Sequence, residues 1–438
     1  MPRAKNLKVL KDLKLRMKHF IKISIPIIIL VLCSCSTKAE STEAKETISA
    51  EHILGNPNFT AISFGGYREK IRNICPSVIE LKEDMKVLSA FNVKILRTYN
   101  TQQFPHAERV LKAIKELKEE NTSFEMYVML GAWMECLGAF TATRNHAKEN
   151  LMGNQAEIKR AIELAKEYPD IVKIIAVGNE SMVHWAETYS VYPNVILNYV
   201  EQLQKLKKQG ELSSDLWITS SDNFASWGGG STDYQSEDLD KLIEAVDYVS
   251  MHTYPFHDTH YNPEFWQIDS TDLSKSKIDL AKEGMLRAKN YAVAQYESTR
   301  KYIHSISPDK PIHIGETGWA TSAFSNYGVN GSHAADEFKQ KLYYDYMRKW
   351  STAKGLACFY FEAFDEPWKD TNDEHASENH FGLINIKNEA KYALWSLVDS
   401  GQFEGITRNG NPISKTYGGN EEVLLKSILA PAVQNKKL

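Results

Sequence analysis

The sequence predicts an α/β protein built as a single (β/α)8 TIM barrel. Eight short β-rich runs alternate with amphipathic helical runs, and this repeat of element types continues over about 340 residues. That length accommodates a barrel with several long loops. Acidic and polar residues also follow directly on several β-rich runs, which is where the functional loops of such a barrel gather.

The first segment is expected to be removed before the protein folds. Residues 1–34 join a basic stretch to an apolar run, in the order of a signal peptide. The apolar run has about ten residues, whereas a membrane-spanning helix needs about twenty. It ends in a lipobox-like Cys33-Ser34-Cys35, which makes Cys35 the expected lipidation site; alternatively, both cysteines are incidental residues of a cleaved peptide. The basic region is long for such a signal, and Met17 would begin a more typical one.

Composition divides the rest of the chain into a tether, a barrel and an extension. Residues 35–50 are small and polar and have no aromatic residue, so we expect a flexible tether. The barrel is assigned to residues 51–400, and residues 401–438 are given only a packing role as its C-terminal extension. Without residues 1–34 the chain has 44 basic and 55 acidic residues, a net charge of −11. This charge argues against a nucleic-acid partner.

The expected strands are rich in β-branched and aromatic residues and end at turn residues. They are Ala61–Gly65, Val93–Tyr99, Met126–Gly131, Val172–Val177, Leu216–Ser220, Tyr248–Thr253, Pro311–Gly315 and Ala357–Phe361. The helical runs have apolar residues three and four positions apart. They include Ala107–Glu119, Gln155–Glu167, Val195–Lys208, Asp238–Val246, Leu280–Tyr302, Ala334–Lys349 and Ala390–Val398. An open doubly wound sheet would alternate in the same way, but Gly65-Gly66-Tyr67-Arg68 lacks its phosphate-binding glycine pattern.

Two glutamates follow strands on opposite sides of the predicted barrel mouth. Glu180 follows the fourth strand through Gly178 and Asn179, and Glu316 follows the seventh through Gly315. Hydrolysis of a glycosidic bond needs one carboxylic acid to protonate the departing oxygen and one carboxylate to support the charge at the anomeric carbon. One glutamate at a strand end is more often a capping or salt-bridged residue, whereas the facing pair predicts a glycosidase.

Six segments together resemble those of glycoside hydrolase family 17, the β-1,3-glucanases of the retaining clan A. The resemblance covers roughly residues 61–400. The segments are Ile62–Tyr67, Leu96–Tyr99, Val177–Glu180, Met251–Phe256, Gly315–Trp319 and Phe364–Lys369. Two places depart from the family pattern. Trp319 is followed by Ala320 where the family often has proline, and Ser221-Asp222-Asn223 stands where many bacterial members have a glutamate.

The resemblance implies Glu180 as acid/base, Glu316 as nucleophile, and Glu366 with Lys369 as a charge pair beside them. The chemistry itself assigns two further residues: Asn179 can donate to a substrate hydroxyl beside the anomeric carbon, and Tyr254 can donate to the nucleophile. The other candidate substrate-binding residues either match a family motif or can stack on sugar rings, with core packing as the alternative for each aromatic. They are Arg97, Tyr99, Trp133, Trp319 and Trp368.

A metal or cofactor is not expected. His252, His257, Asp258 and His260 lie close together in sequence, but they follow a Tyr-Pro turn and lack the His-Glu-x-x-His spacing of a zinc site. The cysteines at positions 75, 136 and 358 are widely spaced, which predicts structural thiols rather than a disulfide or zinc framework.

The sequence therefore predicts a retaining hydrolase of laminarin-like β-1,3-glucan, endo-acting and without a cofactor. It is expected to be a monomeric bacterial lipoprotein, held to the membrane only by its lipid, in the periplasm or at the cell surface of the outer membrane. A transglycosylase would use the same two acids and deliver the sugar to another carbohydrate. A non-catalytic glycan-binding lipoprotein would be expected to have lost one of the acids, and neither Glu180 nor Glu316 is replaced.

Overall fold

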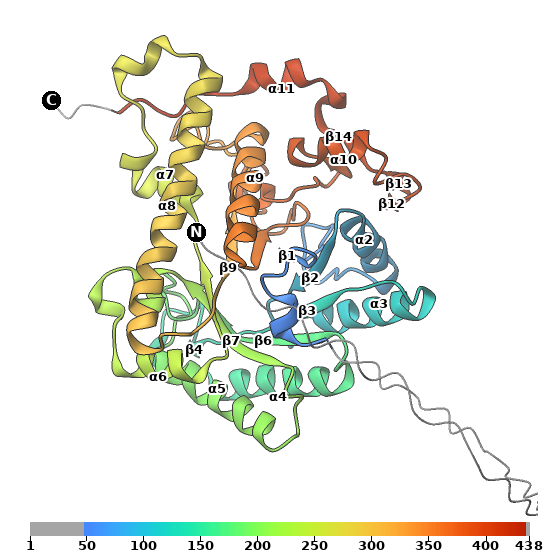
Figure 1. Ribbon diagram of the computed structural model, residues 1–438, viewed down its shortest axis with the longest axis vertical. Helices are drawn as coiled ribbons and strands as arrows, with labels where there is room; N and C mark the ends of the chain where they lie inside the picture. The colour runs from blue at the N-terminus through green and yellow to red at the C-terminus, as the bar shows by residue number, and fades with distance from the viewer. Residues whose placement is uncertain (1–47, 435–438) are drawn as a thin grey trace, which may run out of the picture. The chain divides into compact units, whose positions relative to one another are not determined.

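The computed structural model describes residues 48–434 and confirms the (β/α)8 barrel (Figure 1). The predicted signal peptide, Cys35 and nearly all of the predicted tether lie outside the described residues. Eight parallel strands close the barrel in the order β1-β10-β9-β8-β7-β6-β3-β2. Their bounds are β1 Thr60–Ser63, β2 Val93–Arg97, β3 Tyr127–Ala132, β6 Val172–Asn179, β7 Trp217–Asn223, β8 Val249–His252, β9 Ile312–Gly318 and β10 Cys358–Phe361. The expected fourth and seventh strands are therefore β6 and β9.

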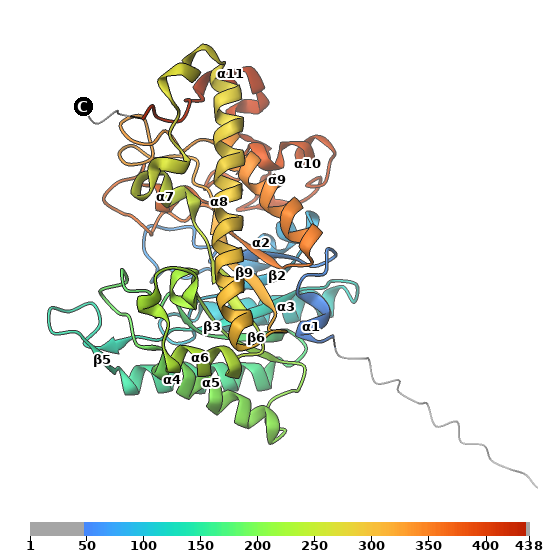
Figure 2. The ribbon, with the colours of Figure 1, turned by 60° about the vertical axis from the view of Figure 1, so that its left-hand side comes forward.

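Helices surround the barrel, and the longest, α8, extends well beyond the strands (Figure 2). The longer helices are α2 Val78–Ala90, α3 His106–Glu120, α4 Leu151–Glu167, α5 Pro193–Lys208, α6 Glu237–Ala245, α8 Lys277–Ile306 and α9 Glu337–Lys354. Shorter helices occupy the loops and ends, namely α1 Ala50–Ile53, α7 Pro255–Tyr261, α10 Trp395–Asp399 and α11 Glu421–Ser427. Among residues 48–434, none of the helices combines the length and the apolar character needed to cross a bilayer.

Several of the described elements were not expected from the sequence, among them helix α2 and one hairpin. Helix α2 begins with a capping box, in which Ser77 and Glu80 each accept a hydrogen bond from the other's backbone amide. The second is a small antiparallel hairpin in the loop after β3, made by β4 (Cys136–Leu137) and β5 (Asn145–Glu149). Its strands are short, and β5 is mostly polar, so an alternation of apolar and polar residues does not predict the hairpin. This hairpin lies beside the cavity described below.

The barrel interior is filled below the site by alternate residues of the strands. Ile95, Met129, Ile174 and Tyr248 are buried in one apolar cluster, to which α1 contributes Ala50 and Ile53. A larger cluster lies between the strands and the surrounding helices. The strands are therefore held on both faces, which fixes the positions of the residues at their C-terminal ends.

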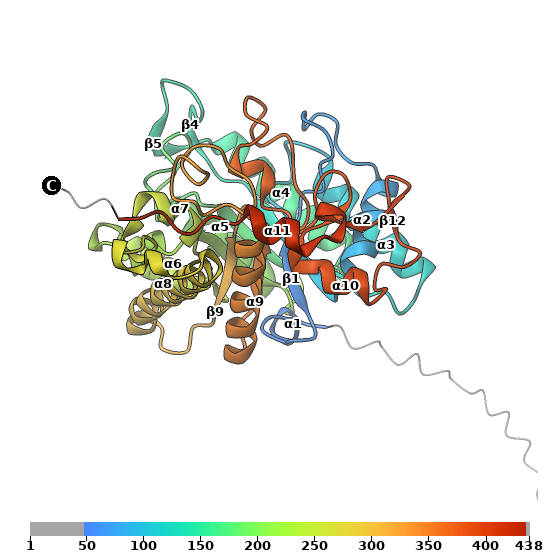
Figure 3. The same cartoon turned by 90° about the horizontal axis from the view of Figure 1, so that it is seen from above.

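The C-terminal segment packs on the barrel. Its β12 strand (Thr407–Arg408) lies on α2, where Arg408 Nε donates to Asp84 Oδ1 at 2.7 Å in a fully buried pair. Helix α11 then packs against α9, as the view from above shows (Figure 3). Residues 401–434 thus join the first and last parts of the barrel.

Candidate active site

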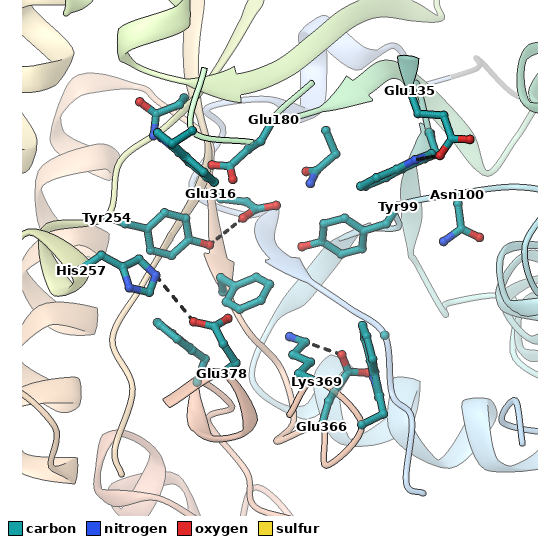
Figure 4. A pocket seen from close by; sticks show the side chains of 18 of the residues that line it. Tyr99, Asn100, Glu135, Glu180, Tyr254, His257, Glu316, Glu366, Lys369 and Glu378 are labelled. Atoms are coloured by element: carbon teal, nitrogen blue, oxygen red, sulfur yellow. Dashed lines mark hydrogen bonds and ion pairs between the residues drawn. The ribbon is translucent and has the colours of Figure 1, made fainter. Parts of the chain in front are cut away.

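A cavity of about 1630 Å³ opens at the C-terminal ends of the strands. It is larger than the 300–1,000 Å³ typical of sites for small molecules. Its described lining includes Tyr99, Asn179, Glu180, Tyr254, Glu316, Glu366, Trp368 and Lys369, several of which are labelled in Figure 4. Most of the site residues predicted from the sequence therefore line this one cavity.

The backbone before each acid is shaped by a glycine. Gly178 has φ of 83°, and Glu180 itself has φ of 46°, a left-handed conformation that non-glycine residues rarely adopt. The Glu180 amide donates to Ser221 O at 3.0 Å, which holds this turn. At Gly315 a Cβ atom would lie 2.1 Å from Ser250 Oγ, so only glycine fits between β9 and β8. Backbone strain of this kind is typical of functional sites.

Glu316 is held as an acceptor by two strong donors. Arg97, which is 1% exposed, forms an ion pair with Glu316 Oε1, and the Tyr254 hydroxyl donates to Oε2 at 2.6 Å. Burial holds the pKa of Tyr254 well above its usual range, so this hydroxyl keeps its proton. These contacts favour the ionised form of Glu316, as a nucleophile requires.

Arg97 also orients Asn179. Its Nη2 donates to Asn179 Oδ1 at 2.6 Å, which turns the amide nitrogen of Asn179 to the other side. One buried guanidinium thus fixes both the Glu316 carboxylate and the amide beside it. The sequence identified Arg97 as a candidate, but not these contacts.

The two acids meet at one histidine. His252 Nδ1 lies 3.1 Å from Glu180 Oε1 and 3.8 Å from Glu316 Oε2, because β8 pairs with β9 with His252 opposite Glu316. These two carboxylate oxygens are therefore separated by no more than the sum of the two distances, which excludes all but the shortest spacings of an inverting enzyme. His252 Nε2 lies 2.7 Å from Ser221 Oγ, which completes the support of the ring.

Glu180 has surroundings opposite to those of Glu316. Burial, followed by the negative charge of Asp222, raises the pKa of Glu180 to about 8, although Arg97 opposes the shift. Burial and Arg97 hold the pKa of His252 well below its usual value, so this ring is neutral and brings no positive charge to Glu180. Glu180 is therefore protonated near neutral pH and can act as a general acid.

Glu366 and Lys369 lie at another part of the cavity, together with Glu362, which sequence reasoning missed. Lys369 Nζ lies 2.6 Å from Glu362 Oε1 and 3.5 Å from Glu366 Oε2. Glu366 Oε1 accepts a hydrogen bond from the Tyr67 amide at 3.0 Å, so it joins the loops after β1 and β10. The cluster shapes the wall of the cavity.

The aromatic candidates divide into two groups. Tyr99, Trp133 and Trp368 line the cavity, and the Arg72 guanidinium lies 4.2 Å from the centre of the Trp368 ring. Trp319 is fully buried instead, with its indole nitrogen donating to Ala334 O at 2.8 Å. The prediction that Trp319 binds substrate is wrong. After Glu316 the alternation of β9 points Thr317 and Trp319 toward the surrounding helices, where Trp319 packs against Tyr343.

The histidines grouped in the sequence have separate contacts. His252 faces the two acids, whereas His257 lies 3.2 Å from the Tyr327 hydroxyl and 3.8 Å from Glu378 across the cavity (Figure 4). Asp258 accepts a hydrogen bond from Asn262 at 2.7 Å. Within residues 48–434 no three histidine, cysteine or acidic side chains are grouped so that they could hold a metal ion. The cysteines at positions 75, 136 and 358 are free thiols.

Glu157 on α4 is a further residue that sequence reasoning missed. Its carboxylate accepts hydrogen bonds from the amides of Thr101, Gln102 and Trp133 at 2.7, 3.0 and 3.3 Å. It therefore ties the loops after β2 and β3 to one helix. It lies within an ordinary amphipathic pattern, so no sequence signal distinguishes it.

Comparisons with known proteins agree with this geometry. An endo-laminarinase from Formosa Hel1_33_131 is 55% identical to this chain, and the match covers 89% of this chain and 99% of that one, with a TM-score of 0.87. A glucan 1,3-beta-glucosidase of Arthroderma benhamiae is 24% identical over 73% of this chain and 85% of the relative. A β-1,3-glucanosyltransferase of Rhizomucor miehei, solved with laminaritriose, shares 19% identity over 77% of this chain and 96% of its own, with a TM-score of 0.53. The last likeness shows the fold alone.

The family model for the BtgE/BtgC glycoside hydrolase domain matches residues 61–382. This range begins in β1 and includes all eight barrel strands, both glutamates and the Glu366–Lys369 pair. The chain therefore belongs to the BtgE/BtgC glycoside hydrolase family.

Proposed function

We propose that this protein hydrolyses laminarin-like β-1,3-glucan, cutting within the chain and retaining the configuration at the anomeric carbon. The observation that carries the proposal is the pair Glu180 and Glu316, which meet at His252 but have opposite electrostatic surroundings. The 55% identity to an endo-laminarinase supports the substrate. A cavity larger than a small-molecule site supports binding of several sugar units.

The first step of the proposed reaction forms a glycosyl-enzyme. A Glu316 oxygen attacks the anomeric carbon as the glycosidic bond breaks, and protonated Glu180 gives its proton to the departing oxygen. Arg97 and Tyr254 hold the attacking carboxylate in place through the contacts described above. The Asn179 amide donates to the neighbouring sugar hydroxyl, and this bond strengthens as positive charge develops.

The second step releases the sugar to water. Glu180, now ionised, takes a proton from the incoming water, whose oxygen attacks the anomeric carbon and displaces Glu316. Glu180 regains its proton and both acids return to their starting states. No cofactor takes part in this scheme.

The test measures release of reducing sugar from laminarin, cellulose, mannan and xylan. We expect laminarin to be cleaved much faster than the other three, with early products several sugars long. Equal rates on laminarin and cellulose would refute the proposed specificity for β-1,3-glucan, but they would not contradict the two-acid mechanism. Products longer than the substrate at high oligosaccharide concentration would identify a transglycosylase instead.

We also propose that the protein is exported and anchored by a lipid on Cys35, as a monomer on the bacterial outer membrane. The order of residues 1–35 supports the anchor. Cys35→Ala should release the protein from the membrane fraction or block its processing. Wholly soluble, unlipidated wild-type protein would refute the anchor, and light scattering tests the monomer.

A further inference from the structure

Two aromatic side chains stand exposed at the rim of the cavity, outside the segments that resemble family 17. Phe140, at the tip of the β4–β5 hairpin, is 63% exposed, and Trp185, in the loop after β6, is 60% exposed. Both line the cavity that contains Glu180 and Glu316. Exposed aromatics of this size contribute little to a core, and where they gather at a site they mark binding surfaces.

The backbone of Phe140 is strained. Its φ is 61°, in the left-handed region, which is unfavourable for a residue with a Cβ. Glycine or asparagine would adopt this conformation more easily. A strained backbone that presents a phenyl ring to solvent therefore points to a function for the ring.

Hydrogen bonds hold the ring in place. The Phe140 amide donates to Thr188 O at 2.8 Å, and the Cys136 amide donates to Tyr189 O at 2.9 Å, so the hairpin is tied to the loop that carries Trp185. The Phe140 ring stacks on Tyr189 at 5.6 Å between ring centres. A surface fixed in this way loses little entropy when a ligand binds.

The aromatic series continues into the cavity. Tyr189 also packs against Trp133, with ring centres 4.7 Å apart, and Trp133 lines the cavity beside Glu135. Phe140, Tyr189 and Trp133 thus form a continuous row from the rim inward. Both ends of this row, Phe140 and Trp133, line the cavity that also contains the two acids.

We propose that Phe140 and Trp185, each exposed at the rim of the cavity, are platform residues that bind a distal part of the glucan chain, away from the bond that is cut. This proposal rests on the proposed hydrolysis of β-1,3-glucan. Pyranose rings have faces of C–H groups that can lie on aromatic rings, and neutral sugars need no charged partner at this rim. The platform makes cleavage depend on chain length, because only longer chains reach from the two acids to the rim.

The test compares Phe140→Gly, Trp185→Ala and the double variant with wild type on laminarin and on laminari-oligosaccharides of increasing length. Glycine suits the backbone of residue 140, so Phe140→Gly removes the ring and relieves the strain together. Phe140→Tyr, which keeps a ring, is the rescue variant. Phe324→Ala is the matched control, since Phe324 is 61% exposed and is not among the residues described as lining the cavity.

We expect each platform variant to raise KM for laminarin about five- to tenfold. The effect should shrink as the oligosaccharide shortens, kcat should change less than KM, and Phe140→Tyr should restore the wild-type KM. Unchanged KM at every chain length, or the same increase in Phe324→Ala, would overturn the platform. If the wild type cleaves no β-1,3-glucan, the proposed function is wrong and the platform proposal falls with it.

Discussion

The protonation of Glu180 predicts how activity changes with pH. Burial and the nearby Asp222 raise the pKa of Glu180 to about 8, and the protonated form is the one that can assist the departing group. Activity on glucan should therefore be lost as the pH rises through about 8. His252 does not add a second transition near pH 6.5, because burial holds its pKa well below that value.

The size of the effect follows from this pKa. With a pKa of about 8, about nine-tenths of Glu180 is protonated at pH 7 and about one-tenth at pH 9. We expect kcat/KM for laminarin to fall roughly tenfold between these values. An ordinary glutamate would be less than about 1% protonated at pH 7, so the site's environment increases the active form more than a hundredfold.

The assay measures kcat/KM from pH 5 to pH 10 with two donors. Laminarin needs a proton on its departing oxygen, whereas a glycosyl fluoride of laminaribiose does not, because fluoride leaves unaided. The alkaline loss should appear with laminarin and be much weaker with the fluoride. A midpoint below pH 6, or an equal loss with both donors, would refute the assignment of Glu180 as the acid.

Asp222→Asn refines the same test. Asparagine keeps an oxygen for the Met182 amide, which donates to Asp222 Oδ2 at 2.8 Å, but it removes the negative charge that helps to raise the pKa of Glu180. The alkaline midpoint should therefore move to lower pH. No movement would mean that burial alone sets the pKa of Glu180.

Three other outcomes follow from the contacts of the site and of the C-terminal segment. With an activated glycosyl fluoride donor, whose leaving group needs no proton, added azide should rescue Glu316→Ala with a product of inverted configuration and Glu180→Ala with a retained one. Chromatography of the glycosyl azides checks this, and the same configuration in both variants would refute the two roles. Tyr254→Phe should lower kcat/KM about 10- to 100-fold, because it removes a 2.6 Å charge-assisted hydrogen bond to Glu316, and an unchanged value would exclude that role. Arg408→Ala should lower the free energy of unfolding by about 3 kcal/mol in urea titration, because it leaves the buried Asp84 with Arg68 as its one remaining cation. Lys415→Ala, at the more exposed pair with Asp399, should cost less than about 1 kcal/mol, and similar losses in the two variants would refute the stabilising role of the buried Arg408–Asp84 pair.

The fold could be predicted because each barrel strand is buried on both faces. Runs such as Val172–Val177 are almost wholly apolar, so their composition alone marks them as strands, and the structure has a strand at each of the eight places. Helix α2 was missed although its capping box can be recognised in Ser77 and Glu80.

The error at Trp319 has a physical reason. An aromatic residue next to a strand-end acid suggests a sugar platform, but side chains alternate along a strand, and Trp319 falls on the outward series with Thr317. His252, the last residue of β8, and Tyr254, which follows it, both contact Glu316 instead. The alternation of side chains along β9 therefore indicates the direction of Trp319 better than its aromatic character does.

The division of labour between the two glutamates could not be read from local sequence. Both follow a glycine at the end of a buried strand, yet Glu316 faces the cation Arg97 from β2, 219 residues away, whereas Glu180 faces a neutral histidine and lies near an anion. Two identical side chains thus favour different protonation states, because other strands supply different partners to each. A variant that removes the positive charge, Arg97→Met, should therefore impair the nucleophile Glu316 while Glu180 keeps its proton. Because Arg97 opposes the raised pKa of Glu180, the alkaline midpoint of its residual activity should move to higher pH, and a move to lower pH would show that Arg97 acts mainly through the shape of the site.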